Sequence, residues 1–240
     1  RKKTICIIFG GISVEHEVSI ISANSILNNI DFKNYRPIGL YLTKKGGFRY
    51  CKIINKSGKK QFLPQAYSTS FKPGTSKPIQ INKNTSIDVD VFFPIIHGTG
   101  GEDGSIQGLI KTLDRPFVGC DILGSAITMN KILTKELVKK EGINVTKYEI
   151  IKNSLSDKNI KIIKKNIGFP CFVKAANLGS SIGVYKTNNE KELKLNIKKS
   201  LNFTNSVFVE EAVLKAAEIE VSALQVKEKI LTSTPGEIEP

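Results

Sequence analysis

A lysine at the end of an apolar run, followed by a loop of glycines and serines, is the first feature suited to binding phosphate. Cys171-Phe172-Val173-Lys174 precedes Asn177-Leu178-Gly179-Ser180-Ser181-Ile182-Gly183. Glycines let backbone N–H groups approach phosphate oxygens, serine hydroxyls add donors, and Lys174 adds a positive charge. The segment is not a Walker A loop, because Gly-Lys-Ser/Thr is missing and a strand is predicted to follow it. Taken alone, it fits a hairpin turn without a ligand equally well.

Further polar side chains accompany two other glycine-rich turns. Glu15 follows Gly10-Gly11, and His97 opens a loop to Gly104 that also holds Glu102-Asp103. A single histidine after an apolar strand is more often structural, but one that opens a loop with four glycines favours a role at a ligand. His16 lies between two glutamates at the start of a predicted helix, and we expect it to be exposed and without a role.

Two more sites of negative charge lie near the end of the chain. Glu210 and Glu211 end an apolar run, and Glu218 begins the next one. The pattern alone fits solvated charges at the edge of a sheet as well as it fits a binding site.

The elements that position the first polar group form an α/β pattern. Thr4 to Phe9 and Val89 to Ile96 read as buried strands, and Tyr35 to Thr43 completes a βαβ unit. The intervening helix is predicted to be capped by Ser13 and to pack through the following residues: Val14, Val18, Ile21, Ile26, Leu27 and Ile30. Ligands bind at the carboxyl ends of strands in open α/β sheets, so both glycine turns should face one crevice.

The remaining elements are read from periodicity and from turn residues. Lys44 to Ser86 should form hairpins and loops, a helix should follow His97 to Gly104, and one helix should run from Ser125 to Lys140. The second half reads as α+β, with strands and helices in the following ranges: 145–152, 157–167, 171–176, 184–187, 190–201, 207–213, 218–226 and 230–233. Residues 236–240 supply no closing element, so the chain reads as interrupted.

Composition excludes several classes of protein. The length of 240 residues predicts two domains, and no apolar run is long enough to span a membrane. The net charge is +14, but only four of the 36 basic residues are arginine, so lysine-rich solvated surface is favoured over nucleic-acid binding. The four cysteines are scattered and predicted to be reduced, structural thiols. Without a signal-peptide pattern, a cytoplasmic location is expected.

Six segments, taken in order, resemble the D-alanine-D-alanine ligases of the ATP-grasp superfamily. The two longest are Gly10 to Ser19 and His97 to Gly108; the others are Met129-Asn130-Lys131, the strand ending in Lys174, Gly179 to Gly183, and Val209-Glu210-Glu211. The resemblance covers Lys3 to Pro240. It implies an N-terminal Rossmann-like substrate-binding domain with a parallel sheet (1–118), a central α+β ATP-grasp domain (119–213) and the incomplete start of a C-terminal ATP-grasp domain (214–240).

The resemblance also implies the roles of individual residues. Glu15 and Ser180 would be the catalytic residues and, with His97, would bind the first D-alanine. ATP would be bound by the following residues: Lys131 and Lys174 at its phosphates, Gly179, Ser180, Ser181 and Gly183 in a closing loop, Glu210, Glu211 and Val213 at adenine, and Glu218 at ribose. The spacing before Glu218 is one residue longer than usual, and Glu210 and Glu211 are interchangeable in this alignment.

The implied reaction is ATP-dependent joining of two D-alanines through a D-alanyl phosphate, for peptidoglycan precursors. The ligands of Mg²⁺ or Mn²⁺ are expected beyond Pro240, and the 240 residues alone are expected to lack ligase activity. A D-alanine-D-lactate or D-alanine-D-serine ligase and a catalytically silent nucleotide-binding fragment remain open alternatives. The family resemblance further implies a homodimer.

Overall fold

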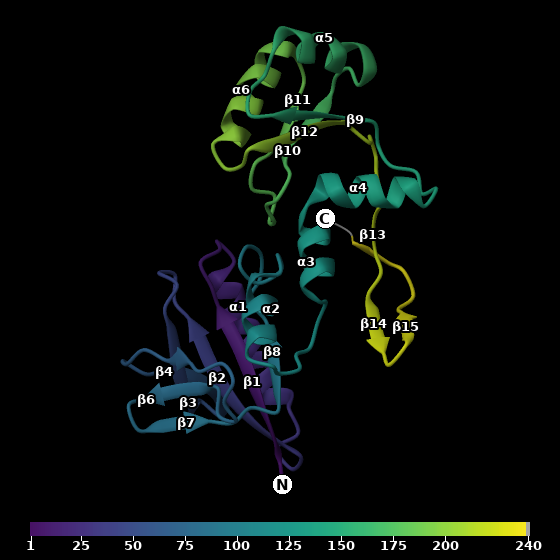
Figure 1. Cartoon of the computed structure of the whole chain (residues 1–240). Coiled ribbons are helices and arrows are strands. Elements are labelled where there is room, and N and C mark those ends of the chain that lie inside the picture. Colours follow the sequence, from purple (N-terminus) through teal and green to yellow (C-terminus); the bar gives the residue numbers. More distant parts are fainter. Residues whose placement is uncertain (239–240) are drawn as a thin grey trace.

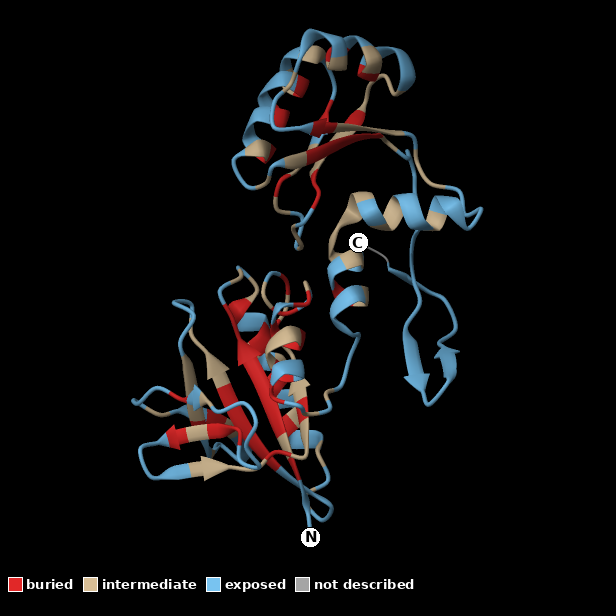
Figure 2. Cartoon of the chain, in the orientation of Figure 1, coloured by how far each residue is buried: buried red, intermediate tan, exposed pale blue. Residues whose placement is uncertain are grey.

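The computed structural model describes residues 1–238 and contains two packed regions, connected by helices, and an extended C-terminal arm (Figure 1). The cores of the two regions are separate clusters of buried side chains (Figure 2). Among the described residues, no helix combines the length and apolar character needed to cross a membrane.

The first region is built on a five-stranded sheet in the order β4-β3-β2-β1-β8. Its elements are β1 (Lys3–Gly10), α1 (His16–Asn29), β2 (Tyr35–Leu42), β3 (Phe48–Lys56), β4 (Lys59–Pro64), β5 (Ser70–Phe71), β6 (Ile79–Asn82), β7 (Thr85–Ile87), β8 (Val91–Pro94) and α2 (Ser105–Thr112). β1 pairs in parallel with β2 and β8, which confirms the predicted α/β class. β3 and β4 add antiparallel strands, and β5, β6 and β7 form a small separate sheet, so the expected hairpins are present.

Helix α1 packs through only part of the predicted face: Leu27 is buried and Ile26 packs against the same core, as predicted. Val14, Val18 and Ile21 are exposed, whereas the helix residues that are buried are His16, Ser19, Ala23 and Leu27. The expected exposure of His16 was therefore wrong. Both its ring nitrogens and the Ser19 hydroxyl have hydrogen-bond partners, and a polar residue with satisfied hydrogen bonds can be buried at little cost. Ser13 is not the cap either, because the helix begins at His16 after Glu15.

The predicted helix from Ser125 to Lys140 is in fact two helices. α3 (Ile122–Met129) and α4 (Lys131–Lys140) meet at Asn130. The Asn130 side chain accepts hydrogen bonds from the backbone N–H groups of Ile132 and Leu133, both at 3.1 Å. An asparagine that caps a helix satisfies donors that would otherwise be free, so Asn130 starts a new helix. This places Lys131 in the first turn of α4.

The second region is a four-stranded sheet in the order β11-β10-β12-β9, with two helices. Its elements are β9 (Tyr148–Lys152), α5 (Asp157–Asn166), β10 (Cys171–Ala175), β11 (Val184–Thr187), α6 (Glu190–Leu201) and β12 (Ser206–Glu211). One sheet face, with Val173 and Val209, packs in a core with residues of α5 and α6. Since strand side chains alternate, Lys174 and Glu210 belong to the opposite face.

The C-terminal arm consists of β13 (Glu218–Glu220), β14 (Ala223–Val226), β15 (Lys229–Thr232) and β16 (Gly236–Ile238). β13 pairs with β16 and β14 with β15, both antiparallel. The prediction that residues 236–240 hold no closing strand was thus wrong for 236–238, and the predicted strand 218–226 is interrupted. Residues 239–240 lie outside the described range. Every residue of these four strands is exposed (Figure 2).

Candidate functional site

The Glu15 carboxylate lies where two glycine-rich loops of the two regions meet. A side chain at Gly98 would overlap Oε2 of Glu15, and a Cβ placed on Gly179 would lie 3.5 Å from the same oxygen. Gly98 belongs to the loop after β8, whereas Gly179 belongs to the loop between β10 and β11. The structure therefore places the predicted amino-acid site directly beside the predicted phosphate loop, with Ser180 next to Gly179 in the chain.

The loop from His97 to Gly104 is held by side-chain hydrogen bonds. Ser13 Oγ donates to the carbonyl oxygen of His97 at 2.7 Å, and Ser22 Oγ lies 3.0 Å from His97 Nε2. Asp103 accepts from the backbone N–H of Gly100 at 2.8 Å, which lowers the Asp103 pKa although burial alone would raise it. The loop is thus fixed from α1 and from within itself.

His16 holds the neighbouring Gly10-Gly11 turn. Its Nδ1 lies 2.6 Å from the carbonyl oxygen of Gly11, and its Nε2 lies 2.9 Å from the Tyr41 hydroxyl. The carbonyl can only accept, so Nδ1 carries a proton and donates. Sequence reasoning missed this contact; its available signal was that Tyr41 lies one residue before the end of β2, the strand beside β1.

The loop between β10 and β11 is anchored at both ends. Lys131 Nζ donates to the carbonyl oxygen of Leu178, and Ser200 Oγ donates to that of Gly183 at 3.0 Å. Between these anchors, Ser180 and Ser181 are exposed and adopt left-handed backbone angles, with φ of 49° and 57°. Left-handed residues in a turn direct backbone N–H groups outward, the arrangement that favours anions.

Two lysines flank this loop: Lys131, which binds the carbonyl oxygen of Leu178, and Lys174 near the end of β10. Burial, and then the charge of Lys174, lower the pKa of Lys131. Two ammonium groups that repel each other gain when an anion is placed between them. The pair is therefore suited to a phosphate group.

Glu210 receives three polar contacts on the same sheet face. Lys174 Nζ pairs with Oε1, Lys135 Nζ lies 2.8 Å from Oε2, and Thr146 Oγ1 donates to Oε2 at 2.9 Å. Burial alone would raise the Glu210 pKa, but the hydrogen bonds from Lys135 and Lys174 outweigh it and lower the pKa. Sequence reasoning missed Lys135, although it lies one helical turn after Lys131 and so on the same face of α4.

Three residues that were predicted to bind ATP take no part in the contacts of Glu210. Glu211 accepts a hydrogen bond from the backbone N–H of Lys147 at 2.9 Å instead. Val213 is 59% exposed, and Glu218 is exposed on the arm. Of the two adjacent acids, it is thus Glu210 that contacts Lys174.

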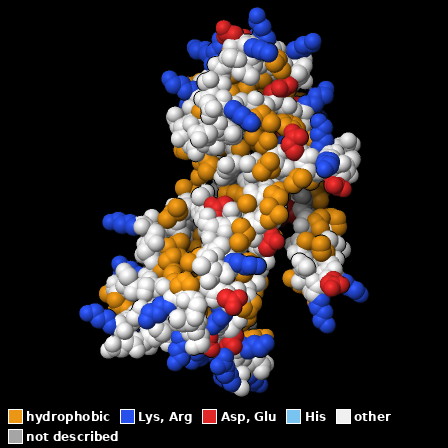
Figure 3. Space-filling view, viewed as in Figure 1, with side chains coloured by type: hydrophobic (Ala, Val, Ile, Leu, Met, Phe, Trp, Pro, Cys, Tyr) orange, Lys and Arg blue, Asp and Glu red, His pale blue; other side chains and the backbone are white. Residues whose placement is uncertain are grey.

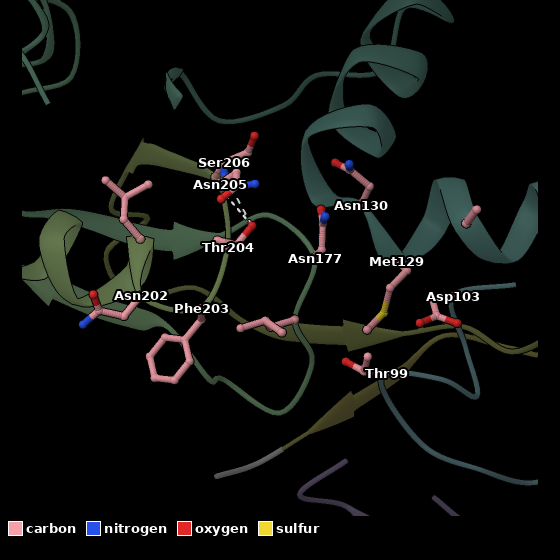
Figure 4. A pocket seen from close by; sticks show the side chains of 13 residues that line it. Thr99, Asp103, Met129, Asn130, Asn177, Asn202, Phe203, Thr204, Asn205 and Ser206 are labelled. Carbon is pink, nitrogen blue, oxygen red and sulfur yellow. Dashed lines mark hydrogen bonds between the residues drawn. The ribbon is translucent and has the colours of Figure 1, made fainter. Parts of the chain in front are cut away.

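A cavity of about 680 Å³ borders the two loops (Figure 4). Thr99 and Asp103 of the first region line it, together with Asn130, Asn177 and the segment Leu201 to Ser206. Lys174 and Glu210 are not among its lining residues. Within residues 1–238, no group of three or more His, Cys, Asp or Glu side chains is placed to hold a metal ion.

The remaining polar and thiol groups behave as structural or surface residues. All four cysteines are free, and burial raises the pKa of Cys51 to about 12 and of Cys171 to about 11. On the face shown in Figure 3, lysine and arginine side chains are dispersed over the outline of both regions. Lys161, Lys164 and Lys165 are exposed on α5, which agrees with the expected lysine-rich solvated surface.

Two family models match the chain. "D-ala D-ala ligase N-terminus" matches residues 4–120, and "D-ala D-ala ligase C-terminus" matches residues 137–240. The chain belongs to the D-alanine-D-alanine ligase family. It is 38% identical to the D-alanine--D-alanine ligase of Thermoanaerobacter sp. (strain X514) and 39% identical to that of Clostridium novyi (strain NT), covering 100% of this chain and 68% of each relative.

Solved structures of this family have the same fold. D-alanyl-alanine synthetase A from Vibrio cholerae matches with a TM-score of 0.84 and 30% identity, over 100% of this chain and 68% of that one. The VanG D-Ala:D-Ser ligase from Enterococcus faecalis matches with a TM-score of 0.81 and 28% identity, over 100% and 70%. The ATP-grasp architecture expected from the sequence is thereby confirmed.

Proposed function

We propose that this chain carries the ATP site and the first amino-acid site of an ATP-dependent ligase that joins two D-alanines for peptidoglycan precursors. The observation that carries the proposal is that the Glu15 carboxylate lies beside Gly179. Gly179 belongs to the loop between β10 and β11, and Lys131 binds the start of that loop. The reaction requires the carboxyl group of one D-alanine to lie next to the phosphate that is transferred. Glu15, proposed to bind the amino acid, lies next to the loop proposed to bind that phosphate.

The first D-alanine would bind through its ammonium group at Glu15. A carboxylate that is fixed beside two loops attracts a cation more strongly than one in bulk water does. His97, held by Ser22, and Ser180, in the neighbouring loop, would contact the same substrate. Its carboxylate would then point toward the loop from Gly179 to Gly183.

The residues present fit the phosphates of ATP. Lys131 and Lys174 supply two close cations, and Gly179, Ser180, Ser181 and Gly183 supply an exposed turn able to close over the phosphates. Adenine would lie against the backbone from Glu210 through Glu211 to Val213. Glu218 would hold the ribose after a change in the position of the arm.

The reaction proceeds in two substitutions. A carboxylate oxygen of D-alanine attacks the γ-phosphorus of ATP and breaks the bond to ADP, which yields a D-alanyl phosphate. The amine of the second D-alanine attacks the acyl carbon, loses a proton, and releases phosphate. Lys131 and Lys174 would offset charge on the transferred group, and closure of the loop would exclude water.

A divalent cation, Mg²⁺ or Mn²⁺, would supply further charge stabilisation for phosphoryl transfer. The described residues contain no acidic cluster for it, and no step above depends on it. We also propose three domains, at 1–118, 119–213 and 214–240, and a cytoplasmic location. The protein is further proposed to be a homodimer, and sedimentation velocity would test this.

The test is turnover by the full-length gene product with ATP, magnesium and D-alanine. We expect ADP, phosphate and D-alanyl-D-alanine in equal amounts. Offering D-lactate or D-serine as the second substrate separates the alternatives, and D-serine is included because VanG is similar. Preference for D-lactate or D-serine, or ADP release without a dipeptide, would contradict the proposal.

A catalytically silent nucleotide-binding fragment is the remaining alternative for residues 1–240 themselves. Calorimetry of this chain with ATP and with D-alanine measures binding, and a dipeptide assay measures turnover. We expect binding of both ligands and no dipeptide. Dipeptide synthesis by the 240 residues would show that the expectation of an inactive fragment is wrong.

A further inference from the structure

We propose that Lys135 is a positioning residue for the nucleotide site. Lys135 would hold the Glu210 carboxylate in place when Lys174 exchanges its ion pair with Glu210 for one with a phosphate group of ATP. The inference rests on the proposed function, because it assumes that ATP phosphates bind at Lys131 and Lys174. It concerns a residue outside the set assigned to ATP or D-alanine above.

The contacts of Lys135 identify its role. Nζ of Lys135 lies 2.8 Å from Oε2 of Glu210 and donates to Thr146 Oγ1 at 2.6 Å, and Thr146 in turn donates to the same Oε2. The ammonium also lies 5.4 Å from the centroid of the Tyr148 ring. These contacts fix Lys135 of α4 against the sheet.

Lys174 has two competing demands in the same place. It pairs with Oε1 of Glu210, yet its charge also contributes to lowering the pKa of Lys131. A phosphate group that approaches both lysines draws Lys174 away from Glu210. Glu210 then keeps only the partners on Oε2.

The burial of Glu210 makes those remaining partners matter. Its side chain is 9% exposed, and that of Lys135 is 18% exposed. A buried carboxylate left without a cation is costly, whereas one that keeps a hydrogen-bonded ammonium is not. Without Lys135, ATP binding would therefore have to leave Glu210 uncompensated or leave Lys174 where it is.

Lys135 could instead contact ATP directly. Substituting Lys135 in the otherwise unmodified chain and in a chain whose Glu210 is uncharged distinguishes these two roles. If Lys135 acts through Glu210, removing its charge matters only while Glu210 carries a charge. If Lys135 binds phosphate itself, its removal weakens ATP binding in either background. The discriminating background is Glu210→Gln.

The experiment is titration calorimetry of the 240-residue chain with ATP. We expect Lys135→Met to weaken ATP binding about tenfold or more, since it removes one partner of a largely buried charge pair. In the Glu210→Gln background, the same change should alter affinity by less than about twofold. Lys135→Arg should retain affinity within about threefold, because the charge remains.

Lys140→Met, an exposed lysine of the same helix, is the matched control and should not alter ATP affinity. If Lys135→Met does not fold, Lys135→Gln takes its place in both backgrounds. An unchanged affinity in the otherwise unmodified chain, or an equal loss in both backgrounds, overturns the inference while the unmodified chain still binds ATP. Failure of the unmodified chain to bind ATP overturns the proposed ATP site instead.

Discussion

The two glycine-rich loops that meet at Glu15 are held in different ways. The loop from His97 to Gly104 is bound by the side chains of Ser13, Asp103 and Gln107. In the loop from Gly179 to Gly183, side chains bind only the two ends, and within the loop the backbone N–H of Ile182 donates to the carbonyl oxygen of Gly179. The hydroxyls of Ser180 and Ser181 have no hydrogen-bond partner within residues 1–238. The comparison suggests a rigid site for the amino acid and a movable one for the phosphate.

The largest effect should come from Glu15→Gln, which removes the charge at the point of contact. We expect D-alanine binding at the first site to weaken about 100-fold, since a fixed carboxylate that pairs with an ammonium is lost. ATP binding should be retained. Calorimetry with each ligand measures both, and Glu17→Gln, whose carboxylate pairs with Lys44 at the surface, is the control. Equal loss of both ligands would contradict separate roles for the two loops.

The second effect tests how rigid the first loop is. Gly98→Ala would press a methyl group against the Glu15 carboxylate, whereas at Gly100 nothing lies within 4 Å. Both glycines have positive φ, 70° and 85°, so the backbone strain of about 1 kcal/mol is shared. We expect Gly98→Ala to weaken D-alanine binding about tenfold more than Gly100→Ala, because small displacements at such sites are costly. Similar affinities of the two variants would show that the loop adapts.

The third effect concerns the protonation of Lys131. Burial and Lys174 lower its pKa below the ordinary value of 10.5 in the free protein, and a bound phosphate would raise the pKa again. ATP binding is therefore coupled to uptake of a proton by Lys131 when the pH is near the lowered pKa of that lysine. The affinity for ATP falls as the pH rises through this pKa. Calorimetry at about pH 9 in two buffers of different ionisation enthalpy measures the uptake. Lys131→Arg, which stays charged, should abolish it; an unchanged uptake would assign the proton elsewhere.

The smallest effect should come from Ser13→Ala. It removes the hydrogen bond to the carbonyl oxygen of His97, which is worth about 1 kcal/mol, or roughly fivefold in D-alanine affinity. The affinity for ATP should not change. A loss of ATP affinity of the same size would mean that the first loop also positions the nucleotide.

Strong hydrophobic periodicity made much of the fold predictable from sequence. The predicted strand 184–187 and the helix 190–201 match β11 and α6 at both ends. The helix buries Leu193 and Ile197 on one face, as its amphipathic pattern predicts. The turn at Gly10-Gly11 and the loop from His97 to Gly104 were predictable because each follows a strand of one parallel sheet, whose carboxyl ends face the same side.

Outside the exposed C-terminal arm, the errors share a physical cause, namely polar residues that satisfy one another's hydrogen bonds. His16 and Ser19 are buried through hydrogen bonds, so hydrophobicity misplaced the first half of the packed face of α1, where Val18 and Ile21 are exposed. Asn130 divides one amphipathic pattern into two helices by capping the second. Lys135 reaches Glu210 across 75 positions of sequence, and single-residue patterns carry no information about such a pair.

Hydrogen exchange of the 240-residue chain with ATP alone and with D-alanine alone tests the difference between the loops most directly. The account predicts that ATP slows amide exchange in residues 176–186 and leaves residues 97–104 unchanged. D-alanine should slow amide exchange in residues 97–104. Without ligand, these residues should already exchange more slowly than residues 176–186, because their loop is held by side chains. Protection of residues 97–104 by ATP alone, without protection of 176–186, would contradict it.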